Sequence, residues 1–440
     1  MKTIKTYFYS TILISLFLLT GLDALAQNRK IDKTYKWKYQ VNESAKITFE
    51  NYDCNLIIHT WDKSEIQYHM TVKASLKSEE EAGKLDTYLE DLKFSHSAGN
   101  VEFNNRFWSS KKSVMGRSTM TLMRGGKLRF TEFKMKGELW IPESCLLTLN
   151  SKYSEIQMDD IQGRLSLELY NDKLYGGTVD SPLKLKAKYS TLQFENMSDI
   201  EADLYNTTIE TGNAGDLIIT SKYSDVRTGN AGKIRIDAYN DKFSFGNTRD
   251  IQFIDKYSDL NAEIAGHLKL DCYNSTVEVV NAQDIELTSK YGKYSFDGAR
   301  NLNLFTSYSD HVKVGSLLSL NINESKYGDY KVNHLDQSLS LMDGYSDKFF
   351  VTKAGALKEV KVNGKYIVLE MGVASDLSYR FNAEVKYPKF DIDEESMNVR
   401  IKVKEGSDLK MEAVKGEESE GMPAFFVNGY EMAVTLTEKL

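Results

Sequence analysis

The chain has 440 residues and a formal net charge of −7, which argues against a nucleic-acid partner because such binding relies on clustered Lys and Arg that neutralise phosphates. Only 4 Pro accompany 26 Tyr and 20 Phe, a composition typical of long β-sheets and unfavourable for a helical protein.

Residues 1–26 have the pattern of a signal peptide. Lys2 and Lys5 precede an apolar run at 12–19, and Ala24-Leu25-Ala26 supplies a small-residue cleavage site. The run is short for a membrane span, and no later segment is apolar enough to cross a bilayer. We therefore expect an exported protein in the periplasm or at the cell surface, without a transmembrane segment after cleavage.

Residues 27–145 are expected to form a β-rich cap with one short helix. Strands are expected at 45–49, 56–59 and 66–72. Ser78 and Glu81 form a capping-box pattern ahead of Leu85 and Leu89, which predicts the helix. The polar and basic stretch at 104–127 is interpreted as a long loop, with a binding loop as the alternative.

A repeat dominates residues 146–372. Large apolar residues open a new run every 17 residues, at Leu183, Ile200, Leu217, Ile234, Ile251, Leu268, Ile285 and Leu302. Counting from that residue as offset zero, offsets zero and two are apolar, and so are offsets nine and eleven. Alternation predicts strands, and the switch from even to odd parity requires a corner between them. Polar residues at offsets seven and eight suit that corner, and Gly and Asn near offsets twelve to sixteen suit a second one.

Two strands and two corners in 17 residues predict an all-β fold, a β-solenoid or parallel β-helix whose coils pair about 4.8 Å apart. Roughly twelve coils, including less regular ones at both ends, would extend about 55–60 Å at that spacing. A 34-residue coil remains open, because offset five alternates between Lys and Tyr and offset six between Tyr and Asn. Residues 373–440 are expected to cap the open end, with strands at 377–387, 398–403 and 425–436 and a polar loop at 405–422.

The offset-five residues form the candidate ligand-contact stripe, which consists of Tyr205, Lys222, Tyr239, Lys256, Tyr273 and Lys290. Parity places them on the solvent side, where each ammonium group is expected to lie near a ring. Aromatic faces at a regular spacing could stack on the sugars of a polymer. The alternative is that the stripe only shields the sheet and keeps it soluble.

Other chemistry gives weak signals, and we expect no catalytic, cofactor or metal site. An Asp column at offset sixteen comprises Asp199, Asp216, Asp250 and Asp284, and is explained by turn chemistry with Ca²⁺ binding as the alternative. The six His show no pair at ligand spacing. Cys272 lies at a small inward position and is expected to be a packed thiol, whereas a bridge between Cys54 and Cys145 stays open.

The order of parts resembles a family of exported, repeat-containing proteins classed as adhesins, which are related to auto-transporter adhesin head domains and common in Bacteroidetes. The matching residues are Asn51-Tyr52-Asp53, Trp61-Asp62, Trp140-Ile141-Pro142 and the Lys-Tyr-Ser or Tyr-Asn-Asp corners, where many members carry a Gly-containing tetrad. The resemblance covers most of residues 35–370. It implies a β-solenoid, adhesion as the function and no catalytic residues.

The expected function is that of a non-enzymatic, exported, adhesin-like protein whose rigid solenoid surface contacts a glycan or a cell-surface protein. Two alternatives remain. Parallel β-helices often cleave acidic glycans, so a polysaccharide lyase or hydrolase is one. The resemblance alone suggests the other, a periplasmic envelope-maintenance or stress-linked protein.

Overall fold

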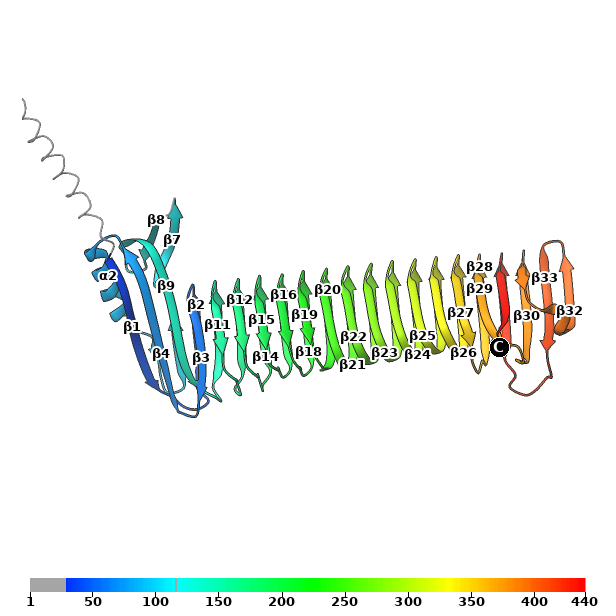
Figure 1. Ribbon diagram of the computed structural model, residues 1–440, viewed down its shortest axis with the longest axis horizontal. Helices are drawn as coiled ribbons and strands as arrows, with labels where there is room; N and C mark the ends of the chain where they lie inside the picture. Colours follow the sequence, from blue (N-terminus) through cyan, green and yellow to red (C-terminus); the bar gives the residue numbers. More distant parts are fainter. Residues whose placement is uncertain (1–28, 115–116, 440) are drawn as a thin grey trace, which may run out of the picture. The chain divides into compact units, whose positions relative to one another are not determined.

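The computed structural model describes residues 29–114 and 117–439. The signal peptide expected at 1–26 lies outside the described residues. Strands make up 72% of the structure, which is a β-solenoid of about 12 turns with a spacing of about 18 residues and one helix, as the repeat predicted. Figure 1 shows the strands of successive coils side by side.

The chain divides into two compact units. The first contains the residues up to 181 together with Tyr189–Leu192, and the second contains Pro182–Lys188 and Gln193–Leu440. The elements of the first unit are β1 (Arg29–Gln40), β2 (Lys46–Tyr52), β3 (Asn55–Trp61), β4 (Glu65–Leu76), α2 (Glu79–Glu90), β5 (Ser95–His96), β6 (Asn100–Asn104), β7 (Trp108–Val114), β8 (Arg117–Leu122), β9 (Lys127–Pro142), β10 (Leu146–Lys152), β11 (Glu155–Met158), β12 (Leu165–Tyr170) and β13 (Lys173–Gly176).

Coil geometry in the first unit begins at β2 and β3. β2 pairs in parallel with β10, and β3 pairs in parallel with β11, in the same register that β10 and β11 keep with β12 and β13. On the other side of this coil β2 pairs in parallel with β6, and β3 with β9. The sheet then becomes antiparallel, because β4 pairs antiparallel with both β9 and β1. The expected strands at 45–49, 56–59 and 66–72 correspond to β2, β3 and β4.

The helix α2 begins where the sequence predicted. The Ser78 hydroxyl accepts the backbone N–H of Glu81 at 3.2 Å and caps the first turn. The Glu81 carboxylate does not complete the capping box, because Arg129 of β9 donates to it through Nε at 2.8 Å. The stretch at 104–127 was wrongly expected to be a loop. It contains the antiparallel pair β7 and β8. These strands were not recognised because they are rich in Ser, Thr and Lys and lack a regular apolar alternation.

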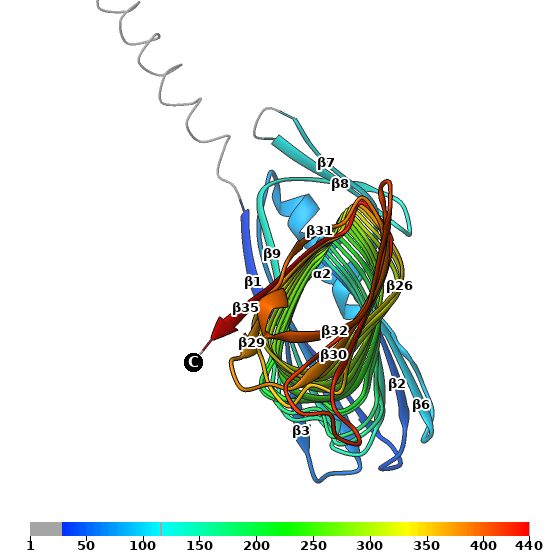
Figure 2. The same ribbon diagram turned by 90° about the vertical axis from the view of Figure 1, so that its right-hand side faces the viewer.

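The second unit stacks the remaining coils. Its strands are β14 (Leu183–Lys188), β16 (Ile200–Tyr205), β17 (Thr208–Thr211), β18 (Leu217–Lys222), β19 (Asp225–Thr228), β20 (Ala231–Tyr239), β21 (Lys242–Lys256), β22 (Asp259–Tyr273), β23 (Thr276–Lys290), β24 (Lys293–Tyr308), β25 (His311–Lys326), β26 (Asp329–Tyr345), β27 (Lys348–Ala354), β28 (Glu359–Lys365), β29 (Val368–Ala374), β30 (Tyr379–Lys386), β31 (Lys389–Asp391), β32 (Met397–Glu405), β33 (Asp408–Lys415), β34 (Ala424–Tyr430) and β35 (Ala433–Lys439). β15 (Thr191–Phe194) has residues in both units, and a 3₁₀ turn covers Glu394–Ser396. Seen end-on, the coils of the second unit superpose into one flattened outline (Figure 2).

One coil is 17 residues long, so the 34-residue alternative is wrong. Leu183 pairs with Ile200, and Ile200 with Leu217, in parallel ladders without a shift. The residues at offsets zero, two, nine and eleven point into the coil and form its core, as predicted. A bulge after Leu287 inserts Phe305 into the next coil, and from there the spacing lengthens.

Each coil turns at its offset-six residue, which we call the corner residue. The corner residues adopt left-handed backbone conformations in which φ lies between 49° and 66°, at Tyr189, Asn206, Tyr223, Asn240, Tyr257, Asn274 and Tyr291. The corner N–H still donates to the next coil, as Tyr257 does to the Tyr273 carbonyl at 3.0 Å. Asn tolerates this conformation well, whereas Tyr is strained in it by about 1–2 kcal/mol.

Buried aspartates complete several corners from inside. The Asp241 carboxylate accepts the N–H of Tyr239 at 2.9 Å and that of Ser224, one coil earlier, at 2.5 Å. Asp310 makes the same pair of bonds with the N–H groups of Tyr308 and Gly292. These N–H groups would otherwise be buried without partners, so the carboxylates stabilise the turn.

The C-terminal segment lies inside the stack and not at its end. β34 pairs in parallel with β28 on one side and with β30 on the other. The segment expected as one strand at 425–436 is two strands, β34 and β35, with a left-handed residue at Glu431 between them. The expected polar loop at 405–422 contains β33, which pairs antiparallel with β30 on one side and with β32, the last strand of the sheet, on the other.

Two substitutions of Tyr257 separate corner strain from ring packing. Ala and Asn both remove the ring, but Asn accepts the left-handed backbone more readily, by about 1 kcal/mol. We expect Tyr257→Ala to lower the urea midpoint of unfolding more than Tyr257→Asn does. Tyr239 is the matched control, since it belongs to a regular strand and contacts the Tyr257 ring at 5.6 Å. An equal difference between Ala and Asn at Tyr239 would contradict the explanation.

Asp172 in the first unit predicts a pH dependence of stability. Burial raises the pKa of its carboxyl from 3.8 to about 6, although the Ser154 and Tyr170 N–H groups lower it in part. The folded pKa exceeds the unfolded one, so the contribution to stability is complete below about pH 4 and is lost as the pH rises through about 6. It is on the order of 2–3 kcal/mol. We expect Asp172→Asn to flatten the dependence of the urea midpoint on pH between 4 and 7. An unchanged profile would show that Asp172 does not cause it.

Candidate functional site

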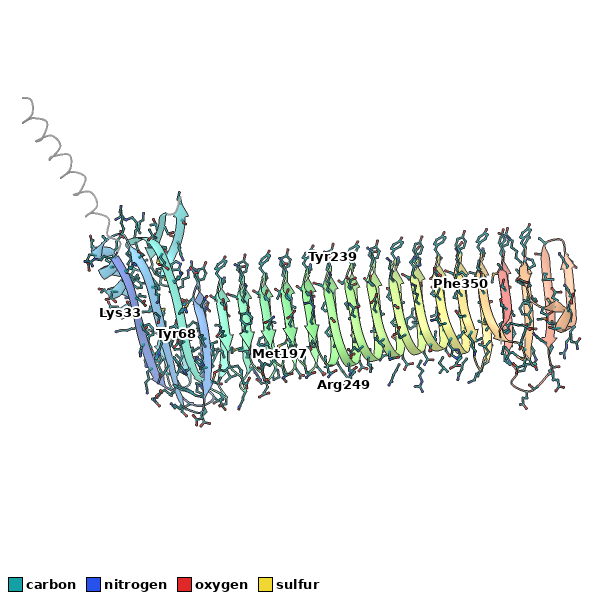
Figure 3. All side chains as sticks on the ribbon, in the orientation of Figure 1. Lys33, Tyr68, Met197, Tyr239, Arg249 and Phe350 are labelled. Carbon is teal, nitrogen blue, oxygen red and sulfur yellow. The ribbon has the colours of Figure 1, made fainter. Side chains whose placement is uncertain are left out.

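A continuous column of tyrosine rings follows the corner edge of the second unit. Each coil contributes one ring, alternately from offset five and from the corner residue. We call this column the tyrosine ladder; it consists of Tyr205, Tyr223, Tyr239, Tyr257, Tyr273, Tyr291, Tyr308, Tyr327, Tyr345, Tyr366, Tyr430 and Tyr387. In Figure 3, Tyr239 marks this edge and Arg249 the opposite one.

The ladder rings meet edge to face. Neighbouring centroids are 5.4–5.8 Å apart and the ring planes cross at 76–85°. This geometry suits the aromatic quadrupole and contributes about 0.5–1.5 kcal/mol per pair. The first unit has its own column of the same kind, with Tyr52, Tyr153, Tyr170 and Tyr189 in contact at 5.5–5.6 Å.

Between Tyr205 and Tyr291 the predicted stripe contains three of the six ladder rings, and it contains none of the six rings beyond Tyr291. Tyr239 and Tyr273, at offset five, are each 37% exposed, whereas the corner residues Tyr223 and Tyr257 are 46% and 43% exposed. The more exposed half was missed because strand parity says nothing about the direction of a side chain at a left-handed corner. The sequence does contain the pattern that identifies the whole ladder. Tyr stands at offset five in one repeat and at offset six in the next, so it occurs once in every coil.

The expected pairing of ammonium groups with rings is wrong for the stripe. Tyr239 has Tyr223 and Tyr257 as its ring neighbours, at 5.8 and 5.6 Å. Within the described residues, Lys222, Lys256 and Lys290 lie over no aromatic ring. The rings of the stripe pack against neighbouring rings and not against ammonium groups, and the lysines lie beside the ladder.

A groove of about 540 Å³ runs beside the ladder on the outward face of β18 to β24. We call it the stripe groove. It brings together the predicted stripe residues Lys222, Tyr239, Lys256, Tyr273 and Lys290, whereas Tyr205 lies outside its lining. Its floor carries outward residues from offset three, which are Asp237, Ile254, Asp271 and Thr288. Tyrosine rings, an exposed isoleucine and charged groups therefore share one surface.

The charged groups of the stripe groove are unpaired within the described part of the chain. None of Lys222, Lys256 and Lys290 forms an ion pair, and neither do Asp237 and Asp271. Solvated, unpaired donors and acceptors next to aromatic rings are the groups with which proteins bind sugars and other polar ligands. The rigid ladder of backbone hydrogen bonds fixes their spacing.

Asp255 lies beneath the groove and is 4% exposed. It accepts hydrogen bonds from the Ser258 N–H at 3.2 Å and from the Ser275 hydroxyl through one oxygen. The other oxygen is buried without a partner in the described structure. Burial raises the pKa of this carboxyl, which favours its neutral form below a groove whose lysines are cationic.

The three cysteines are free thiols in buried positions. Burial raises the pKa of Cys54 and that of Cys145 to about 12. Cys272 is 4% exposed and packed in the core, as expected from its inward position. Its pKa is also raised by burial, so none of the three is an activated nucleophile.

The Asp column at offset sixteen caps turns. Asp199 accepts the N–H of Asp216 at 2.8 Å, and Asp216 accepts that of Lys233 at 2.8 Å. Asp250 likewise accepts the N–H of His267, so these three carboxylates bond backbone in the next coil, which is the turn chemistry expected for them, whereas Asp284 accepts the side-chain amide of Asn301 at 2.7 Å. Among the residues that the structure describes, no group of three or more His, Cys, Asp and Glu side chains could hold a metal ion.

Comparisons with known proteins do not assign the chain to a family. No protein-family model matches the chain, and no curated protein matches it. In the described residues, no helix has the length and apolar character needed to cross a membrane.

Some solved structures show a weak likeness. A proposed cell adhesion protein from Clostridium sporogenes is 7% identical over 93% of this chain and 100% of its own, with a TM-score of 0.15. A proposed lipid-binding protein from Parabacteroides distasonis is 10% identical over 75% and 97%, with a TM-score of 0.18. A proposed adhesin from Parabacteroides merdae is 11% identical over 75% and 96%, also with a TM-score of 0.18. Likenesses at these scores say nothing about function.

Proposed function

We propose that this protein is a non-enzymatic, adhesin-like binding protein that holds an extended carbohydrate chain along the stripe groove. The observation that carries the proposal is the meeting of the tyrosine ladder with unpaired lysines and aspartates in one groove. Tyrosine rings would pack on the apolar faces of sugar rings, and the charged groups would bind hydroxyls.

The geometry of the stack supports a polymeric ligand. Equivalent residues of successive coils lie about 4.8 Å apart, which is close to the length of one pyranose unit in an extended glycan. Tyr239 and Tyr273 occupy the same column two coils apart, with Lys256 between them. A chain lying along the stack would therefore meet the same groups again at regular intervals.

Binding is favoured over cleavage because the groove offers dispersed carboxylates. Asp237 and Asp271 are separated by a whole coil that places Ile254 between them. General acid–base cleavage of a glycoside requires two carboxyl groups that flank a single bond. In our proposal these aspartates accept hydrogen bonds from sugar hydroxyls.

Removing two groove tyrosines tests the proposal. We expect Tyr239→Ser/Tyr273→Ser to weaken retention on an insoluble glycan panel by roughly tenfold or more, because stacking on two rings is lost. The matched control is Tyr345→Ser/Tyr430→Ser, which removes two equivalent ladder rings outside the groove and should retain binding. Equal losses in both variants, or no retention of the unaltered chain, would refute the stripe groove as the site. Release of reducing ends or unsaturated products would instead favour the enzyme alternative.

We also propose that the protein is exported, on the basis of the leader pattern at 1–26. Protease treatment of intact cells, followed with an antibody against the solenoid, measures its location. Loss of signal in intact cells is expected for a surface adhesin. Protection until the envelope is opened would place the protein in the periplasm, and would favour the envelope-maintenance alternative over adhesion.

A further inference from the structure

A second groove of about 410 Å³ lies on the other outward face of the coils, over β23 to β26. Its lining includes Lys293, His311, Lys313, Asp329 and Lys331, all from the two columns that begin at offsets eight and ten of the regular coils. We call it the lysine groove. It shares no lining residue with the stripe groove.

The lysine groove carries one lysine on each of three consecutive coils, and Lys348 continues the row on the next coil, outside the lining. Register pairs Lys293 with His311, His311 with Asp329, and Asp329 with Lys348 in one column. Lys313 pairs with Lys331 in the next column. A row of cations therefore runs along the stack, one per coil, in a chain whose net charge is −7.

Local carboxylates neutralise only part of this charge. Asp329 lies 3.5 Å from the Lys331 ammonium and 3.7 Å from His311. Glu278, at the border of the groove, is the other acidic lining residue. With His311 neutral, the three lining lysines and the two lining carboxylates leave a net charge of +1, and Lys348 adds a further positive charge beside the groove. Within the described residues, neither Lys293 nor Lys313 forms an ion pair.

The same columns are neutralised elsewhere in the second unit. Five coils before Lys313, Arg227 occupies its column and forms ion pairs with Glu210 at 2.8 Å and with Asp225. Lys293 and Lys313 thus differ from Arg227, since they have no acidic partner among the described residues. A like-charged row without partners is costly for the sheet unless an anionic group binds to it.

We propose that the lysine groove binds the acidic groups of a linear anionic polysaccharide lying along the stack. The ligand class follows from the spacing, since cations repeat at about 4.8 Å per coil and a pyranose unit has nearly that length. Lysine ammonium groups act as point charges that accept carboxylate or sulfate without a fixed geometry. Nucleic acid is disfavoured by the acidic chain as a whole and because Tyr294, the one Phe, Tyr or Trp in the lining, is buried.

Binding of polyanions to the full chain tests the inference. The probes are polygalacturonate, which carries carboxylates, dextran sulfate, uncharged dextran and a single-stranded DNA oligonucleotide. We expect one or both acidic polysaccharides to bind, uncharged dextran not to bind, and Lys313→Ala/Lys331→Ala to weaken binding by roughly tenfold or more. The polymer that binds better identifies carboxylate or sulfate as the preferred group.

The matched control is Lys186→Ala/Lys242→Ala, which causes the same change in net charge at outward positions away from the lysine groove. It should retain binding. Equal weakening in the control, absence of binding to both acidic polysaccharides, or tighter binding of the DNA oligonucleotide would overturn the inference. Tyr239→Ser/Tyr273→Ser should leave this binding unchanged, so the proposals for the two grooves are tested independently.

Discussion

Each coil of the solenoid reverses direction at a single left-handed residue, and the parallel backbone ladder holds that residue level with its counterparts above and below. The corner N–H of Tyr257, for example, donates to the carbonyl of Tyr273 in the next coil. A corner that moved by one position would turn every following side chain to the wrong face. The 17-residue length is therefore a consequence of the corner and of the ladder acting together.

Because the register is fixed, any residue type repeated at one offset becomes a column. Inside the corner, Asp241 and Asp310 occupy buried columns where they accept backbone N–H groups from two coils at once. Outside it, tyrosines from two adjacent offsets merge into one edge-to-face ladder. The strain of Tyr in a left-handed conformation costs about as much as ring packing contributes. Both grooves are likewise lined by columns of residues from successive coils, with tyrosines and charged groups in the stripe groove and an excess of lysines over carboxylates in the lysine groove.

Much of the fold could be predicted from the sequence, whereas some residues that line the surface sites could not. The apolar positions of the repeat from Leu183 to Leu302 identified the inward face, and Ser78 identified the start of the helix. The stripe residues Lys222 to Lys290 were placed correctly on the outside. The corner tyrosines Tyr223 and Tyr257 were missed, because alternation describes strands and not the left-handed residue between them. The lysine groove was missed as well, since its columns combine different residue types.

The sequence by itself determined the coil length, the inward face and the solvent-facing stripe, because these depend on periodicity within a single chain segment. The tertiary structure alone decided which rings touch, that two sets of outward residues line separate grooves, and that β34 enters the stack between β28 and β30. Those features depend on pairing between segments far apart in the sequence. Local propensity is the same for a strand at the end of a stack as for one inserted within it, so only the partners of each strand distinguish the two.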